Sequence, residues 1–173
     1  MMLDLDLEPV LQLVGLAVRF ERPWDAEHVS SELVRSGWEP IGSVSLPYPR
    51  RLERDGLPLG ITYDQDLVAL GVTLAEWPVD WNSPDYAGAV ADDYEGKIQD
   101  CRELAGRLAA LLGREFSVES EDPVLDQEEF PFLHVDCWKA ASVHVSLGLM
   151  HLDPDDTPIR VSLYVSQGHA DSP

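Results

Sequence analysis

The strongest constraint on the fold is a two-residue alternation that recurs three times in the last third of the sequence. Within residues 132–140, 142–150 and 159–166, apolar side chains occupy every second position. The expected inward-facing residues are Leu133, Val135, Cys137, Val143, Val145, Leu147, Leu149, Ile159, Val161, Leu163 and Val165. Because successive side chains of a strand point to opposite faces, the sequence predicts an antiparallel three-stranded meander with one face in the core.

Three other segments are predicted to be helical. Residues 9–20 are almost wholly apolar, which is compatible with a helix or a buried strand, and Pro9 near the start favours the helix. The next helix begins after Asp25, a suitable N-cap, and ends before Gly37. Residues 83–112 have apolar side chains at every third or fourth position, so this long helix is expected to cover the meander.

The middle of the chain alternates with a period of two, which predicts strands over residues 41–48, 57–63 and 66–77. Residues 49–56 are predicted to form a charged turn. The last of these strands has small residues on one face, which suits close packing by a helix. We therefore expect one α+β domain over residues 1–173, with an antiparallel sheet formed by the C-terminal meander and strands from residues 40–79. One long helix and the N-terminal helices are expected to pack on it.

Charge limits the classes of partner. The 173 residues include 32 acidic and 12 basic residues, for a formal net charge of -20. Such a field repels phosphate backbones and anionic lipids, so we expect neither nucleic acid nor membrane as a partner. No apolar run approaches the roughly 20 residues needed to span a bilayer, and acidic residues stand where a signal peptide would be basic. We therefore expect a cytoplasmic location.

The acidic residues are segregated along the chain. No basic residue lies between Arg54 and Lys97, or between Arg114 and Lys139, although both intervals are rich in carboxylates. Solubility alone would explain the amount of charge, but it does not require this segregation. We interpret the clusters as an outward-facing recognition surface for a basic protein, which would also accelerate the encounter.

The connection between the predicted strand and the long helix, "AEWPVDWNSPDY", combines aromatic and acidic residues. Its prolines exclude a continuous helix or a central strand. Tryptophan and tyrosine are frequent in binding hot spots because they bury much area at little entropic cost. The candidate partner-binding residues are Trp77, Asp80, Trp81, Asp85, Tyr86, Asp92 and Asp93. For Trp77, a structural role at the end of the core is the preferred interpretation.

A second candidate surface is the outer face of the meander. Its residues are Trp138, His144, Arg160 and Tyr164. The same face could instead be covered by the N-terminal helices. Five residues, His134, Asp136, His144, His151 and Asp153, have metal-binding side chains, but their spacing disfavours a common site and we expect no metal.

The sequence contains no strong catalytic motif. No serine lies in a G-x-S-x-G motif and no glycine-rich phosphate loop occurs. The two cysteines, Cys101 and Cys137, lack a C-x-x-C spacing and are expected to be reduced and buried. We therefore expect no enzyme activity, no catalytic residue and no cofactor. A small enzyme that depends on His144 or His169 is the less favoured alternative.

The order of the predicted elements resembles that of small acidic actinobacterial proteins, among them immunity proteins encoded beside secreted polymorphic toxins. The resemblance depends on Gly37-Trp38, on Leu112-Gly113, and on Trp138 before the hairpin "VHVSLGLMHLDPDDTPIRVSLYV". Within that group, the chain is similar to the inhibitor of an NAD-hydrolysing mycobacterial toxin. The resemblance implies an antitoxin that binds and occludes a cognate toxin. The alternative is a chaperone or adaptor for a secreted protein, and the oligomeric state remains open.

Overall fold

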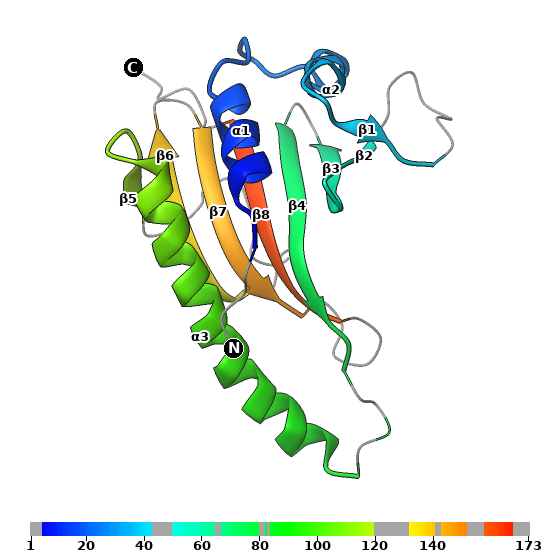
Figure 1. Cartoon of the computed structure of the whole chain (residues 1–173), viewed down its shortest axis with the longest axis vertical. Helices are drawn as coiled ribbons and strands as arrows, with labels where there is room; N and C mark the ends of the chain where they lie inside the picture. Colours follow the sequence, from blue (N-terminus) through cyan, green and yellow to red (C-terminus); the bar gives the residue numbers. More distant parts are fainter. Residues whose placement is uncertain are drawn as a thin grey trace.

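A computed structural model describes residues 5–42, 50–64, 67–79, 82, 84–119, 132–140, 143–151 and 158–167. For residues 63, 64, 67, 86, 87, 89, 90 and 92, the backbone alone is described. The described strands form one 8-stranded sheet in the order β1-β2-β3-β4-β8-β7-β6-β5, and every neighbouring pair is antiparallel. Figure 1 shows this sheet with helices α1 and α3 in front of it.

The described helices are α1 (Glu8–Ala17), α2 (Ala26–Arg35) and α3 (Tyr86–Leu112). The strands are β1 (Glu39–Pro40), β2 (Arg51–Arg54), β3 (Leu57–Asp64), β4 (Leu67–Trp77), β5 (Ser117–Glu119), β6 (Phe132–Ala140), β7 (Val143–Met150) and β8 (Ile159–Gln167). The α+β prediction is confirmed, including the C-terminal meander, which is β6-β7-β8. As expected, the long helix packs on it, because α3 contacts β6 and β7.

The core lies between the sheet and the helices in front of it. One face of the central strands contributes a continuous set of buried aliphatic side chains, and α1, α2 and α3 contribute the opposite wall. Fully buried members of this core include Leu13, Leu33, Leu108, Leu147 and Leu163. Burying this apolar surface is the main force that holds the helices on the sheet.

The helix ends agree with their sequence signals to within a few residues. Segment 9–20, left open between helix and strand, is helix α1 over Glu8–Ala17. The carboxylate of Asp25 accepts a hydrogen bond from the His28 amide at 2.8 Å, and Gly37 has φ +98° after α2. Helix α3 ends at Gly113 as predicted, but it begins at Tyr86, after the expected Ser83, which lies outside the described residues.

The predicted turn over residues 49–56 is wrong, because Arg51–Arg54 forms strand β2. The turn itself is shorter, with Asp55 at φ 52° and Gly56 at φ 79°. Two consecutive positive φ values match the right-handed twist of a two-residue hairpin, for which Asp-Gly is a preferred sequence. Of the strand predicted over residues 41–48, residues 43–48 lie outside the described part of the chain, and Ile41 and Gly42 are not in a strand.

The inward face predicted for β6 is also wrong. Trp138 is opposite Val145 in the register and is 4% exposed, so it faces the core, whereas Leu133 is 38% exposed. The register shifts between Phe132 and His134, and a shift of one residue exchanges the two faces of a strand. The indole of Trp138 buries far more apolar area than the thiol of Cys137, which explains why the tryptophan faces the helices.

The face of β4 that carries small residues is not packed by a helix, contrary to the prediction, because α1 and α3 lie over the opposite face (Figure 1). Instead, the ring of Tyr164 on β8 lies against Gly71, where an added Cβ would be 3.0 Å from the ring. A glycine thus leaves room for an aromatic ring from the neighbouring strand.

Both cysteines, Cys101 and Cys137, are free and buried, as predicted. None of the described helices combines the length and hydrophobicity needed to cross a membrane.

Candidate functional site

Helix α3 extends past the lower end of the sheet (Figure 1). It has 27 residues, which corresponds to about 40 Å at 1.5 Å per residue. Its buried side chains begin at Asp100 and include Cys101, Leu104 and Leu108. Before Asp100, no described side chain of the helix is buried. We call residues 85–95, the N-cap and the first turns of this helix, the α3 arm.

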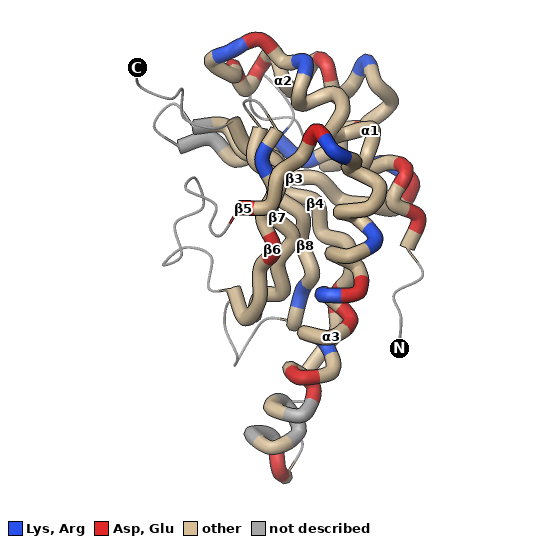
Figure 2. Tube along the Cα trace, turned by 90° about the vertical axis from the view of Figure 1, so that its left-hand side faces the viewer, with Lys and Arg blue, Asp and Glu red and all other residues tan. Residues whose placement is uncertain are grey.

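The α3 arm belongs to an acidic segment. Residues 85–95 contain four carboxylates, Asp85, Asp92, Asp93 and Glu95, and no basic residue. Asp85, Asp93 and Glu95 are exposed. Acidic residues also occur on other elements, and Figure 2 shows both signs of charge around α1 and α2. The arm is distinguished by its projection away from the rest of the molecule, so its charges can enter a concave surface of a partner.

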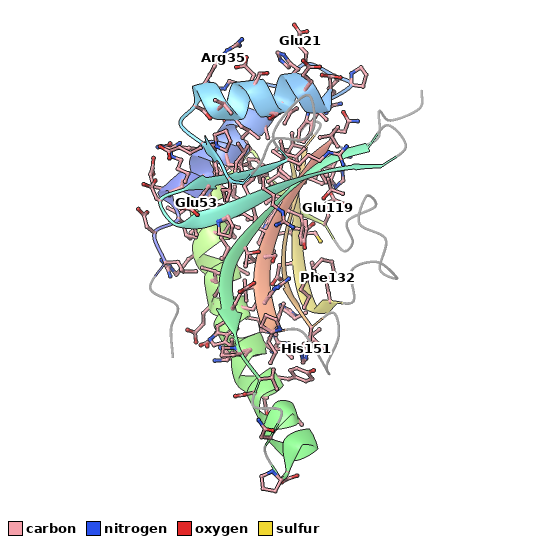
Figure 3. All side chains as sticks on the ribbon, turned by 90° about the vertical axis from the view of Figure 1, so that its right-hand side faces the viewer. Glu21, Arg35, Glu53, Glu119, Phe132 and His151 are labelled. Carbon is pink, nitrogen blue, oxygen red and sulfur yellow. The ribbon has the colours of Figure 1, made fainter. Side chains whose placement is uncertain are left out.

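Two aromatic contacts fix the base of the arm to the lower end of the sheet. The hydroxyl of Tyr94 is hydrogen-bonded to Nδ1 of His151 at 2.5 Å, and the two rings meet edge to face with centroids 5.7 Å apart. His151 is buried and directly follows β7 (Figure 3). The ammonium of Lys97 lies 4.3 Å from the ring centre of Trp77, a cation–π contact. These contacts position the arm relative to the sheet.

The residues predicted for the first candidate surface therefore have different surroundings. Trp77 is half-buried, packs against the core and contacts Lys97, in agreement with the structural role preferred for it. Asp85 and Asp93 are exposed at the arm. The predicted residues that lie outside the described chain are Asp80 and Trp81, and those described by backbone alone are Tyr86 and Asp92.

Three of the four residues predicted for the second candidate surface share one face of the sheet, although His144 and Arg160 are six positions apart in the β7–β8 register. His144, Arg160 and Tyr164 lie on the face of the sheet opposite the core, as the register shows. Trp138 does not join them, because its side chain is in the core. This part of the prediction was wrong for the reason given for β6, namely the exchange of its two faces.

The residues of this face are engaged with their neighbours. Nε of Arg160 lies 2.7 Å from Oε1 of Glu76 on the adjacent strand. The Tyr164 hydroxyl donates to Sδ of Met150 at 3.6 Å, and His144 is only 4% exposed. Burial raises the pKa of the Tyr164 hydroxyl, whereas its hydrogen bond with Ser162 and the nearby Arg160 act in the opposite direction. Two of these predicted binding residues thus have structural contacts.

The histidines and acids considered as metal ligands are separated. His134 and Asp136 form a pair, with Nε2 2.8 Å from Oδ2. The register places them on the face of β6 that faces α3, whereas His144 lies on the opposite face of the sheet. His151 contacts Tyr94 instead. Among the residues that the structure describes, no three His, Cys, Asp or Glu side chains are grouped to hold a metal.

Cys101 has the chemical surroundings of an unreactive thiol. Burial, together with the nearby carboxylate of Asp136, raises its pKa to about 12, although Arg102 acts in the opposite direction. A thiol is a nucleophile only as its thiolate, so Cys101 remains protonated and inert near neutral pH. Cys101 is thus not prepared to act as a nucleophile. The α3 arm is suited to binding through its charge and shape.

Two structural features were missed by sequence reasoning. The Tyr94–His151 pair joins residues 57 positions apart, and neither residue lies in a recognisable motif. A groove between α1, the end of α2 and β2 is lined by two arginines, Arg19 and Arg54. The scarcity of basic residues was the one signal that could have drawn attention to these arginines.

No protein-family model matches this chain, and no curated protein or solved structure gives a significant match to it. Its function therefore has to be inferred from its own charge, burial and geometry.

Proposed function

We propose that this protein is an immunity protein that binds and occludes a cationic secreted toxin, with the acidic α3 arm as the principal contact. The observation that supports this proposal most is the projection of the arm, with Asp93 and Glu95 exposed, beyond the end of the sheet (Figures 1 and 2). An acidic helix that projects from a globular body is suited to enter a positively charged cleft.

The net charge supports the same mode of action. A formal charge of -20 attracts a basic partner over several ångströms and raises the association rate, most strongly at low ionic strength. The contacts Tyr94–His151 and Lys97–Trp77 restrict the base of the arm. A pre-positioned arm loses less conformational entropy on binding than a flexible segment does, which favours affinity.

The resemblance to actinobacterial immunity proteins supports a toxin as the partner, and an NAD-hydrolysing enzyme is the class that it implies. Active sites that bind phosphate-containing substrates are commonly basic. An acidic arm placed in such a site would exclude the substrate by steric and electrostatic means. The inhibitor itself needs no catalytic residue, metal or cofactor for this action.

Co-expression with the protein encoded by the adjacent gene tests the proposal. We expect the wild-type chain to restore growth and to co-purify with that protein. The variant Asp93→Lys/Glu95→Lys should lose both effects. The matched control Glu21→Lys/Glu53→Lys changes the net charge equally at exposed sites away from the arm (Figure 3) and should retain them. Equal rescue by both double variants would exclude the arm as the contact surface.

A chaperone or adaptor function is the second candidate, supported by an apolar edge of the sheet. Strand β5 is the last strand of the described sheet, and its Val118 is 79% exposed. Leu111 on α3 and Leu133 on β6 are also exposed. Edge strands with exposed apolar residues can pair with an extended segment of another protein.

Salt dependence distinguishes the two functions. Binding through the acidic arm should weaken steeply as the ionic strength rises, because the attraction between exposed charges is screened. Binding at the β5 edge should be nearly insensitive to salt and should be impaired by Val118→Asp. Titration of the co-purified partner at low and high sodium chloride measures this difference.

A further inference from the structure

A groove at the end of the molecule opposite the α3 arm has the characteristics of a ligand site. It lies between α1, the C-terminal end of α2 and β2, and it encloses about 530 Å³. Known small-molecule pockets have volumes of roughly 300–1,000 Å³. The lining residues are Gln12, Gly15, Leu16, Arg19, Ser36, Trp38 and Arg54. The groove thus combines apolar walls with two cationic side chains.

Arg54 is held in place by two contacts that leave part of its guanidinium available. Its Nη1 donates to the carbonyl oxygen of Ser36 at 3.0 Å, and its Nε lies 3.5 Å from a carboxylate oxygen of Asp55. The first contact satisfies a carbonyl at the C-terminal end of α2, where a positive charge is favourable. The planar guanidinium has five N–H donors, and its contacts with the described residues involve only Nη1 and Nε, which leaves Nη2 for an anionic group.

Arg19 is the second cation of the groove. Its backbone N–H donates to the carbonyl oxygen of Leu16 at 3.0 Å, but within the described part of the chain its guanidinium has no hydrogen bond or ion pair. Several nearby side chains are already engaged: Gln12 donates to Glu8 at 2.8 Å, and Glu32 is paired with Arg35. An arginine side chain without a partner among the described residues is notable in a protein with a net charge of -20, because carboxylates are abundant enough to pair with it.

The groove has apolar walls next to these charges. Leu16 is half-buried in its wall, and Trp38 lies behind the wall with only 1% of its surface exposed. At Gly15, an added Cβ would meet no atom within 4 Å, so the surface of α1 is open there. An organic ligand could therefore place an apolar portion on these residues while its charged group faces the arginines.

We propose that this groove binds a small organic anion whose phosphate or carboxylate group is held by Arg19 and Arg54. Guanidinium groups match both anions in geometry and form charge-assisted hydrogen bonds that are stronger than neutral ones. The apolar part of the ligand lies against Leu16 and the open surface of α1 at Gly15. This site is separate from the α3 arm and does not depend on the function proposed for the arm.

Thermal unfolding of the full chain at constant ionic strength tests the site. The probes are sodium phosphate and sodium benzoate, with sodium chloride as the reference. We expect a saturable rise in Tm with at least one probe, and the responding probe identifies the preferred anion. Arg19→Gln should weaken the apparent affinity about tenfold or more, because a hydrogen bond to a charged group is lost.

Arg51→Gln is the matched control. Arg51 is exposed on the same strand as Arg54, but it alternates to the opposite face of β2 and does not line the groove. Its replacement removes the same charge and should preserve the affinity. The proposal would be overturned if neither probe exceeded the effect of sodium chloride, or if Arg19→Gln and Arg51→Gln changed the affinity equally.

Discussion

Individual glycines on the outer face of the sheet make room for aromatic rings. An added Cβ at Gly148 would lie 2.3 Å from two ring atoms of Phe132, much closer than the corresponding contact between Gly71 and Tyr164. The two rings also meet edge to face, with centroids 6.1 Å apart. Figure 3 places Phe132 on the side of the sheet away from α3. Steric contact therefore accounts for glycine at these two strand positions, where the residue type is otherwise unfavourable.

Gly148→Ala should destabilise the protein by about 1–3 kcal/mol, because the Phe132 ring must move to admit the methyl group. The matched control is Gly60→Ala on β3, where a Cβ meets nothing within 4 Å, and this change should be neutral or stabilising. Urea unfolding measures both values. If the ring contact is the cause, Gly148→Ala should cost less in a Phe132→Ala background. An equal cost in both backgrounds would contradict this explanation.

Burial of Cys101 predicts a loss of stability at alkaline pH. Below pH 9 the thiol is protonated in both the folded and unfolded states, so its ionisation has no effect. Between pH 9 and about 12 the unfolded chain releases this proton and the folded chain retains it, which favours unfolding. The contribution is at most about 1.4 kcal/mol per pH unit. Urea unfolding from pH 8 to 10.5 should show a shallower decline for Cys101→Ala than for the wild type, and identical slopes would be inconsistent with the raised pKa.

At the scale of elements, the sequence was sufficient to predict the bounds and faces of helices and strands where local signals and side-chain burial agree. Asp25 and Gly37 predicted the ends of α2, and the alternation in β7 and β8 predicted their inward faces. It was insufficient where two apolar patterns compete. In β6 the alternation of Val135 and Cys137 predicted that their face points into the core. Burial of one side chain, Trp138, places the other face there instead. The β2 strand was missed because three of its four residues are charged and only Leu52 is buried.

Because the Tyr94 hydroxyl helps to anchor the α3 arm, we expect its removal to have a local effect on the arm. Tyr94→Phe removes the hydrogen bond to the buried His151 and should cost about 1–2 kcal/mol. Amide hydrogen exchange in the first turns of α3 should become faster, because the arm is then held less firmly. Tyr164→Phe removes a hydroxyl that contacts Met150 and should leave exchange in the arm unchanged. Exchange rates that are identical in wild type and Tyr94→Phe would show that this contact does not anchor the arm.

At the scale of the whole molecule, the two proposed sites lie at opposite ends of the longest axis (Figure 1). The acidity of the arm could be predicted because its carboxylates are consecutive in the sequence, whereas its projection could not, since that depends on where the sheet ends. The groove could not be predicted either, because Arg19, Ser36 and Arg54 come from three separate elements. Composition thus indicated the class of partner, and tertiary structure was needed to locate the surfaces.

The most direct test of the central claim is the rate at which the protein associates with the product of its adjacent gene, measured over a range of sodium chloride concentrations. Opposite charges accelerate encounter, so at low salt Asp93→Lys/Glu95→Lys should associate at least about tenfold more slowly than the wild type. Its salt dependence should also be weaker. The control Glu21→Lys/Glu53→Lys should remain close to the wild type. Equal rates for the two double variants at every salt concentration would contradict a role for the α3 arm in recognition.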